Sequence, residues 1–297
     1  MLFEDVVDSI FRCDTEIDEV LFDGLESFAT VKGDIKVYGK SPLAGMTVST
    51  IQDFALNQGV RWDPISPAAG GVFQTVVGGD EIHYRWHGLL RPVARDGLLL
   101  SVRRHRLSQI GVGNFLDAGD VEQVLGILNT QSPVLVMGPT GSGKTSFLVS
   151  MLMSFAAEER VAIVEHLPEV PRLSPRWIRL CGQAPLLSGE GGVRLESLID
   201  ELLRLRPDRI VIGELRREEV CAYKRALLAG HGAVWTTVHA VSVEDLPRRM
   251  AEFGVGDAGE WREIFCRLGA VVVCLERGVR RFRGIWRFSF DGVHKVL

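Results

Sequence analysis

The sequence predicts an α/β fold in two parts: a smaller mixed α/β N-terminal domain and a larger domain built on a largely parallel sheet. The chain has 297 residues, which corresponds to about two domains of roughly 150 residues each. From about residue 120 onward, short apolar runs alternate with helical patterns, as expected for parallel strands joined by helices. Apolar residues make up 46% of the chain and charged residues 24%, a composition typical of a globular protein that can bury a full core.

Residues 1–105 are predicted to form the N-terminal domain. Alternating apolar and polar residues predict three strands, over Ala29–Val37, His83–Leu90 and Leu98–Arg103. A helix is predicted over Thr50–Gly59, because the segment begins at a pair of hydroxyl residues and ends at a glycine. Residues 106–119 are rich in glycine and polar residues and are predicted to form a hinge or linker.

Residues 120–297 are predicted to form the larger domain. Apolar runs predict strands over Val134–Met137, Val161–Val164, Ile210–Ile212 and Ala233–Val238. Helical spacing of apolar residues predicts helices over Lys144–Ala157, Leu195–Leu205 and Glu218–Ala229. The last elements, Ala270–Leu275 and Arg281–Phe288, are predicted to form a closing hairpin. We therefore expect a parallel sheet covered by helices on both faces.

Cysteine usage and hydropathy predict a cytoplasmic protein. The five cysteines contain no CxxC pair, which favours reduced thiols over a disulfide framework or a zinc site. The first residues carry acidic groups where a signal peptide needs basic ones, and the longest apolar stretches are too short to span a bilayer. Peripheral attachment to a membrane complex stays open.

Charge is unevenly distributed along the chain. The net charge is −4, which argues against an overall basic nucleic-acid-binding protein. Residues 1–26 carry nine acidic residues and one basic residue, whereas residues 276–297 carry six basic and two acidic residues. Two interpretations remain open: both segments are solvated faces, or they are complementary surfaces on neighbouring subunits of a ring.

A glycine-rich segment after the first strand of the larger domain carries the strongest chemical signal. Gly138-Pro139-Thr140-Gly141-Ser142-Gly143-Lys144-Thr145 matches the pattern G-x-x-x-x-G-K-[ST] between an apolar strand and a predicted helix. Glycines let backbone N–H groups point at phosphate oxygens, and the helix N-terminus adds partial positive charge. Lys144 is expected to reach the β and γ phosphates and Thr145 to bind Mg²⁺. The predicted nucleotide-binding residues are Gly138 to Thr145 and Ser146.

Two apolar strands end in acidic residues that could prepare a water molecule for attack on the γ-phosphate. Glu165 follows one strand, and Glu214 follows another after Gly213. The carboxyl ends of parallel strands share one sheet edge, so both acids are expected beside the phosphate loop. Gly213 stands where many ATPases of this broad class have a metal-supporting aspartate. Thr145 and Glu214, with water, are therefore the predicted magnesium ligands.

Two histidines, His231 and His239, flank the predicted strand after Glu214. Either could contact the γ-phosphate, because a neutral imidazole both donates and accepts hydrogen bonds. A structural role for each remains the alternative. A metal-binding role is disfavoured, since no third ligand lies at a suitable spacing.

Four blocks in a fixed order carry a family resemblance. They are GPTGSGKT (138–145), VEHLPE (164–169), RPDRIVIGELR (206–216) and GHGAVWTTVHA (230–240). Together they resemble the Walker A, Asp box, Walker B and His box of the secretion ATPase superfamily of type II/type IV secretion and type IV pilus motors. The likeness covers residues 120–290 firmly and residues 12–106 only loosely.

The resemblance implies a RecA-like P-loop ATPase domain in a homohexameric ring that hydrolyses ATP with Mg²⁺. It implies partners in an inner-membrane secretion or pilus platform, and no sequence-specific nucleic acid. By position, Lys144 and Thr145 bind phosphate and Mg²⁺, Glu214 is the Walker B acid, Glu165 the Asp-box acid, and His231 and His239 the His-box histidines. Arg216 follows the Walker B acid, and Arg103 and Arg104 would be phosphate-facing arginines from the N-terminal domain. An arginine-rich edge strand is the alternative for that pair.

One departure from the family pattern concerns the Asp box, where His166 stands in place of the usual second acid. This change weakens the case for metal support from that loop. The chain is closer in size to the compact type IV secretion branch and to the core of the Tad/Flp pilus motors than to the larger type II motors.

An export or pilus motor is the leading hypothesis. The alternative is a nucleotide-dependent ring component with weak hydrolysis that gates a membrane partner. A nucleic-acid translocase is disfavoured by the net charge and by the lack of interleaved aromatic and basic residues.

Overall fold

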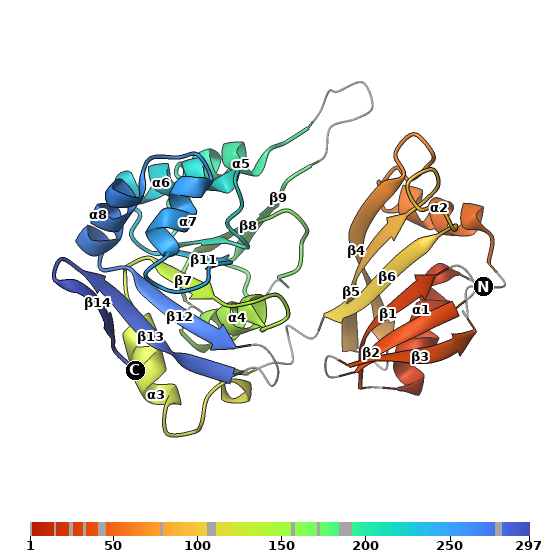
Figure 1. Cartoon of the computed structure of the whole chain (residues 1–297), viewed down its shortest axis with the longest axis horizontal. Coiled ribbons are helices and arrows are strands. Elements are labelled where there is room, and N and C mark those ends of the chain that lie inside the picture. The colour runs from red at the N-terminus through yellow and green to blue at the C-terminus, as the bar shows by residue number, and fades with distance from the viewer. Residues whose placement is uncertain are drawn as a thin grey trace. The chain divides into compact units, whose positions relative to one another are not determined.

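The computed structural model divides the chain into two compact units, Met1–Arg106 (unit 1) and Leu107–Leu297 (unit 2) (Figure 1). It describes residues 2–14, 16–23, 26–31, 34–40, 46–77, 80–105, 111–155, 158–170, 173–183, 192–276 and 281–297. Among these residues, no helix combines the length and apolar character needed to cross a membrane.

Unit 1 is built on a six-stranded antiparallel sheet with the strand order β3-β2-β1-β6-β5-β4. Its elements are α1 (Phe3–Cys13), β1 (Ile17–Asp23), β2 (Glu26–Val31), β3 (Asp34–Lys40), α2 (Val48–Asn57), β4 (Ala68–Val77), β5 (Asp80–Leu89) and β6 (Leu99–His105). Both helices contribute to one core with the sheet. That core is rich in aromatic rings, with Phe54 in contact with Phe3, Phe73 and Trp86.

One sequence prediction in unit 1 is wrong, and the helix α1 and the strands β1 and β4 were not predicted. The single strand predicted over Ala29–Val37 is wrong, because β2 ends at Val31 and β3 begins at Asp34, and the two strands pair antiparallel. The helix α1 was not predicted, although its residues Phe3, Val6, Val7 and Ile10 are all buried. These residues recur at the spacing of one helix face, which is the signal that would have identified the helix.

Unit 2 contains an eight-stranded sheet with the order β14-β13-β12-β7-β11-β10-β8-β9. The strands from β12 to β9 run parallel, and β13 and β14 add an antiparallel edge. The elements are η3 (Val112–Asn114), α3 (Val121–Leu128), β7 (Val134–Met137), α4 (Lys144–Phe155), β8 (Val161–Glu165), β9 (Ile178–Cys181), α5 (Leu195–Leu202), β10 (Arg209–Ile212), α6 (Glu219–Leu228), β11 (Val234–Val238), α7 (Leu246–Glu252), α8 (Ala258–Leu268), β12 (Val271–Glu276), β13 (Arg281–Ser289) and β14 (Gly292–Lys295).

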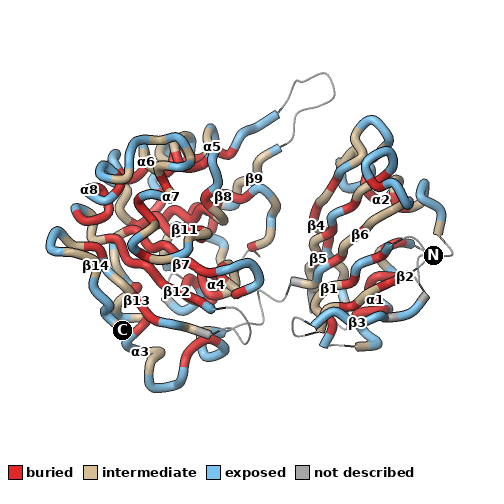
Figure 2. The backbone as a smooth tube through the Cα atoms, viewed as in Figure 1, coloured by how far each residue is buried: buried red, intermediate tan, exposed pale blue. Residues whose placement is uncertain are grey.

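Helices cover both faces of this sheet, as predicted. One core packs the sheet against α5, α6, α7 and α8, and a second packs it against α3 and α4. Successive residues of a strand point to opposite faces. Thus Leu135 and Met137 of β7 lie in the first core, while Val134 and Val136 lie in the second. Figure 2 shows that β7, β8 and β11, which helices cover on both faces, are buried along their length.

The predicted strands of unit 2 agree with the structure to within one or two residues, whereas the predicted hinge does not end where expected. Residues 106–110 of that hinge lie outside the described residues. Further along, Phe115 and Leu116 are buried in the second core, next to α4. The last part of the predicted hinge therefore belongs to the packed body of unit 2. The helices α3, α7 and α8 and the strands β9 and β14 were not predicted.

Candidate functional site

The glycine-rich segment forms the loop between β7 and α4, and its glycines are required by the backbone. Gly141 and Gly143 have φ angles of 78° and 85°, in the left-handed region that other residues rarely adopt. At Gly138, a Cβ atom would lie 2.7 Å from both the Leu275 carbonyl oxygen and the Ser142 Oγ. Gly138 therefore packs against the end of β12 and the Ser142 side chain with no room for a larger residue.

Lys144 is the first residue of α4, and its ammonium group is drawn into the loop. Nζ donates hydrogen bonds to the carbonyl oxygens of Gly138, at 2.9 Å, and Pro139, at 3.0 Å. The residue is only 8% exposed. Burial lowers the pKa of Lys144 to about 8, against the opposing effect of the Glu214 carboxylate. The amine is therefore mostly charged at neutral pH and sits where it can exchange two carbonyl partners for phosphate oxygens.

The rest of the loop offers the donors that an anion needs. Pro139, Thr140 and Gly141 are exposed, while Thr145 and Ser146 are half-buried at the N-terminus of α4. The free N–H groups of a helix N-terminus, a lysine ammonium and hydroxyl groups together form a donor set that suits phosphate.

His239 connects Lys144 to Glu214 at the carboxyl edge of the sheet. Its Nδ1 lies 3.5 Å from Lys144 Nζ, and its Nε2 lies 3.2 Å from Glu214 Oε1. A neutral imidazole that accepts at Nδ1 and donates at Nε2 satisfies both contacts. Burial and the charge of Lys144 lower the pKa of His239, although Glu214 acts in the opposite direction. The structure thus brings these three predicted residues together.

Arg216 occupies the second oxygen of Glu214. Its Nε and Nη2 lie 3.0 and 2.8 Å from Glu214 Oε2. The Glu214 side chain is 29% exposed and the Arg216 side chain 55% exposed, so solvent reaches the carboxylate. With His239 on one oxygen and Arg216 on the other, the orientation of Glu214 is fixed from both sides.

Glu165 is turned into the protein rather than toward Lys144. It is 4% exposed, and its two carboxylate oxygens accept hydrogen bonds from the Val170 N–H at 3.1 and 3.2 Å. Burial raises the pKa of Glu165 to about 8. Its strand end does adjoin that of β10, since a Cβ at Gly213 would lie 3.4 Å from Glu165 Cγ. The predicted adjacency is therefore present, but the carboxyl group caps its own loop instead of facing the phosphate position.

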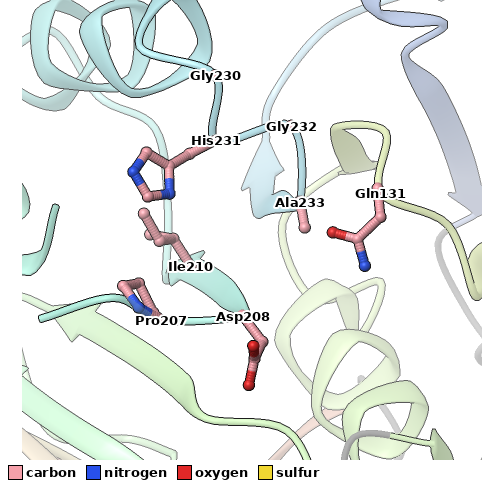
Figure 3. Close-up of a pocket in the computed structure, with 8 residues that line it drawn as sticks. All are labelled: Gln131, Pro207, Asp208, Ile210, Gly230, His231, Gly232 and Ala233. Carbon is pink, nitrogen blue, oxygen red and sulfur yellow. The ribbon is translucent and has the colours of Figure 1, made fainter.

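His231 lies at the opposite edge of the sheet from the phosphate loop. It precedes β11, whereas His239 follows it, and a five-residue strand separates its ends by roughly 16 Å. His231 lines a pocket with a volume of about 290 Å³, and Figure 3 shows the residues around it. The lining residues are Gln131, Pro207, Asp208, Ile210, Gly230, His231, Gly232 and Ala233. Within this chain, His231 therefore lies away from the phosphate loop, and His239 is the one of these two histidines that contacts Lys144.

The two predicted arginines of unit 1 differ in their surroundings. Arg104 donates hydrogen bonds to the carbonyl oxygens of Phe11 and Ile17 at 3.3 and 3.2 Å, and its guanidinium lies 5.3 Å from the centre of the Phe11 ring. Arg104 therefore connects β6 to α1 and to the start of β1. Arg103 is exposed on β6. A phosphate-facing role for Arg103 stays a prediction, while Arg104 has a structural role.

Sequence reasoning missed three residues that support the site. Arg249 Nε donates to the carbonyl oxygen of His239 at 3.2 Å. Thr237 Oγ1 donates to the carbonyl oxygen of Gly213 at 2.8 Å. Glu219, buried in the first turn of α6, binds the backbone of Arg216. Glu219 is an acid five residues after Glu214 at a predicted helix start, and this was the one available sequence signal.

Metal support at this edge is sparse. Among the described residues, no group of three or more His, Cys, Asp or Glu side chains is arranged to hold a metal ion. The predicted ligands Thr145 and Glu214 lie on α4 and after β10, respectively. An ion here would need phosphate oxygens and water to complete its coordination, as is usual for Mg²⁺ in nucleotide sites.

Residues 67–274 match the protein family described as type II/IV secretion system protein. A putative conjugal transfer protein of Mycobacterium tuberculosis strain H37Rv is 34% identical over 230 residues, which cover 75% of this chain and 65% of that protein. This chain therefore spans less than two thirds of the relative's length.

Two solved structures share the fold. The ATPase DotB of Legionella pneumophila has a TM-score of 0.61 at 16% identity, covering 91% of this chain and 74% of DotB. The pilus retraction motor PilT with bound ADP has a TM-score of 0.58 at 18% identity, covering 92% of this chain and 78% of PilT. The predicted RecA-like domain with an N-terminal α/β domain is confirmed by this likeness. Since the family match covers more than half of the chain, the protein belongs to the family of type II/IV secretion system proteins.

Proposed function

We propose that this chain is the subunit of a homohexameric ATPase that powers a type II/type IV secretion or type IV pilus machine. One observation carries the proposal: Lys144, His239 and Glu214 form a continuous set of contacts at the mouth of a phosphate-binding loop. Membership of the type II/IV secretion family supports the role. The conjugal transfer relative supports a macromolecular export machine over an isolated metabolic enzyme.

The loop would bind the triphosphate through groups already directed inward. Phosphate oxygens would replace the Gly138 and Pro139 carbonyl oxygens as partners of Lys144, and the N-terminus of α4 would add backbone donors. Thr145 would hold Mg²⁺ with its hydroxyl oxygen, and the ion would neutralise charge on the β and γ phosphates. The described donor set fits ATP with a magnesium ion held largely by the nucleotide itself.

Glu214 is the residue best placed to orient the attacking water. Its carboxylate is partly exposed and fixed by His239 and Arg216. A water molecule would compete with one of these partners for a carboxylate oxygen, and its proton would pass to Glu214. His239 lies between Lys144 and Glu214, so its imidazole would respond when the γ-phosphate engages Lys144. Hydrolysis changes the contacts of the γ-phosphate, which lie at the Lys144 end of this set of residues. His239 is therefore the residue best placed to sense ATP hydrolysis.

The second candidate, a nucleotide-dependent ring component with weak hydrolysis, is favoured by one specific observation. Glu165 is buried with both oxygens on Val170, so Glu214 is the one acid of the two that reaches the candidate site. With a single acid and few metal ligands, ATP binding is better supported than rapid turnover. In this second candidate function, the nucleotide-bound ring gates an inner-membrane partner.

Steady-state ATP hydrolysis and nucleotide binding together test the proposal. Lys144→Ala is expected to abolish nucleotide binding without unfolding the protein, because its contacts are confined to the loop and His239. Glu214→Gln is expected to retain binding and lower kcat by about 100-fold or more. Glu218→Gln, an exposed acid on the same segment, is the matched control and is expected to behave like the wild type.

Three outcomes separate the candidates. Hydrolysis that depends on Glu214 supports the motor. Intact ATP binding with equal, near-zero turnover in the wild type and Glu214→Gln supports the gating ring. Unchanged nucleotide affinity in Lys144→Ala refutes the site assignment. Light scattering in the presence of ATP tests the hexamer, for which a persistent monomer would be the contrary result.

A further inference from the structure

A buried carboxylate lies just behind the candidate site and is not part of it. Glu219 begins α6 and is 0% exposed. Its Oε1 lies 2.6 Å from His166 Nε2, and its Oε2 accepts a hydrogen bond from the Arg216 backbone N–H at 2.9 Å. Both oxygens therefore have a partner, each from a different loop at the carboxyl edge of the sheet.

The charge state of Glu219 follows from these partners. Burial alone would raise the pKa of Glu219, but the hydrogen bond from His166 and those from the backbone N–H groups of Glu219 and Arg216 outweigh it and hold that pKa below its usual range. An ionised carboxylate inside a protein is costly unless every oxygen is bound. The position of Glu219 at the helix N-terminus adds a favourable dipole interaction. The anion is therefore stable only while both loops keep their present places.

These contacts connect to Glu214 through Arg216. The Arg216 backbone is bound by Glu219, and the Arg216 guanidinium is bound to Glu214 Oε2. His166 directly follows Glu165 at the end of β8, the strand that pairs with β10. Glu219 thus ties the loop after β8 to the segment between β10 and α6, and that segment carries the candidate catalytic acid.

We propose that Glu219 is a positioning residue for Glu214, acting through Arg216, and that His166 is the partner that holds Glu219 in place. This inference rests on the proposed ATPase function. The contact between His166 and Glu219 gives a physical reason for a histidine at position 166. An acid there would face the Glu219 carboxylate, and two like charges at that distance repel strongly. The imidazole turns the same contact into an attraction.

The test compares four single variants in steady-state hydrolysis. Glu219→Ala and His166→Ala are expected to lower kcat by about 10-fold to 100-fold, since small displacements of a catalytic group have effects of this size. Nucleotide affinity is expected to stay within about twofold, because neither residue contacts the phosphate loop. His166→Gln, which can still donate to Glu219, is expected to recover most of the activity. Glu218→Ala, a neighbouring exposed acid, is the control.

A double-mutant comparison separates positioning from a general loss of structure. If Glu219 acts on Glu214, then Glu214→Gln lowers kcat by a much smaller factor in the Glu219→Ala background than in the wild type. Equal factors in both backgrounds overturn the proposal. Should Glu219→Ala fail to fold, His166→Ala and His166→Gln carry the same comparison.

Amide hydrogen exchange at Arg216 provides a readout that needs no turnover. Loss of the Glu219 carboxylate is expected to speed exchange of the Arg216 N–H, while Glu218→Ala leaves it unchanged. Unchanged exchange of the Arg216 N–H in Glu219→Ala refutes the positioning role even if hydrolysis is lowered. If the wild type shows no Glu214-dependent hydrolysis, the proposed function fails, and the exchange experiment still decides whether Glu219 fixes this segment.

Discussion

The buried lysine of the phosphate loop predicts an unusual pH dependence of nucleotide binding. Burial lowers the pKa of Lys144 to about 8 in the free protein, whereas an exposed lysine titrates near ~10.4. Phosphate oxygens favour the charged amine, so binding requires a protonated Lys144. From pH 7 to pH 9 the charged fraction falls from about nine tenths to about one tenth. The Kd for ATP is therefore expected to rise about tenfold across this range, and about tenfold more for each further pH unit.

Fluorescent-nucleotide titrations between pH 7 and pH 9.5 would measure this effect. The terminal phosphate loses its last proton near pH ~6, so the charge of the nucleotide is constant over the range. Glu165 also has a pKa raised to about 8, and Glu165→Gln controls for its ionisation. A wild-type Kd that stays flat to pH 9 would contradict the reasoning about burial. The same slope in Lys144→Ala would assign the pH dependence to another group.

Two further predictions concern the stability of each unit. In unit 1, the buried Asp8 accepts hydrogen bonds from Tyr84 at 2.6 Å and Thr75 at 2.7 Å. Although burial opposes it, these bonds and Arg12 hold the pKa of Asp8 below 3.8, so its contribution to stability is lost as pH falls through that lowered pKa. Asp8→Asn should lower the free energy of unfolding by about 1–3 kcal/mol at pH 7, and denaturant melts should show this deficit shrinking below about pH 4. In unit 2, Glu159→Ala removes the carboxylate bound by the fully buried Arg209 at 2.7 and 2.9 Å. Its expected cost is about 3 kcal/mol, and a change below about 0.5 kcal/mol would show that other contacts of Arg209 suffice.

The sequence was most informative where local pattern and tertiary environment agree. The strands β7, β8, β10 and β11 are continuous apolar runs because helices cover both faces of the sheet, so their bounds could be predicted closely. In unit 1 the antiparallel sheet gives weaker signals. The strands β2 and β3 were predicted as one strand because apolar residues continue on both sides of residues 32–33. The helix α1 was missed because its acidic residues hid the buried face formed by Phe3, Val6 and Ile10.

The candidate site shows the same division. The loop between β7 and α4 was predicted residue by residue, because the conformations of its glycines and of Lys144 depend on the local backbone. The sequence did not predict that the side chains of Glu165 and His231 would lie away from this loop. Glu165 was predicted to follow a strand and is the last residue of β8, and His231 precedes β11 as predicted. A position beside a strand does not say which way a side chain turns or which end of the strand faces the ligand. Glu165 turned toward Val170, and His231 lies at the far end of β11.

By itself, the order of residues determined that this chain has a glycine-rich loop of the phosphate-binding pattern between a buried strand and a helix, because that motif is contiguous and its geometry is local. Only the tertiary structure decided which of two acids meets His239 and which histidine meets Lys144. It also decided that Glu219 lies beside His166, 53 positions earlier. Such pairings arise where strands distant in sequence end side by side, and their energies depend on burial and direction, which spacing along the chain does not encode.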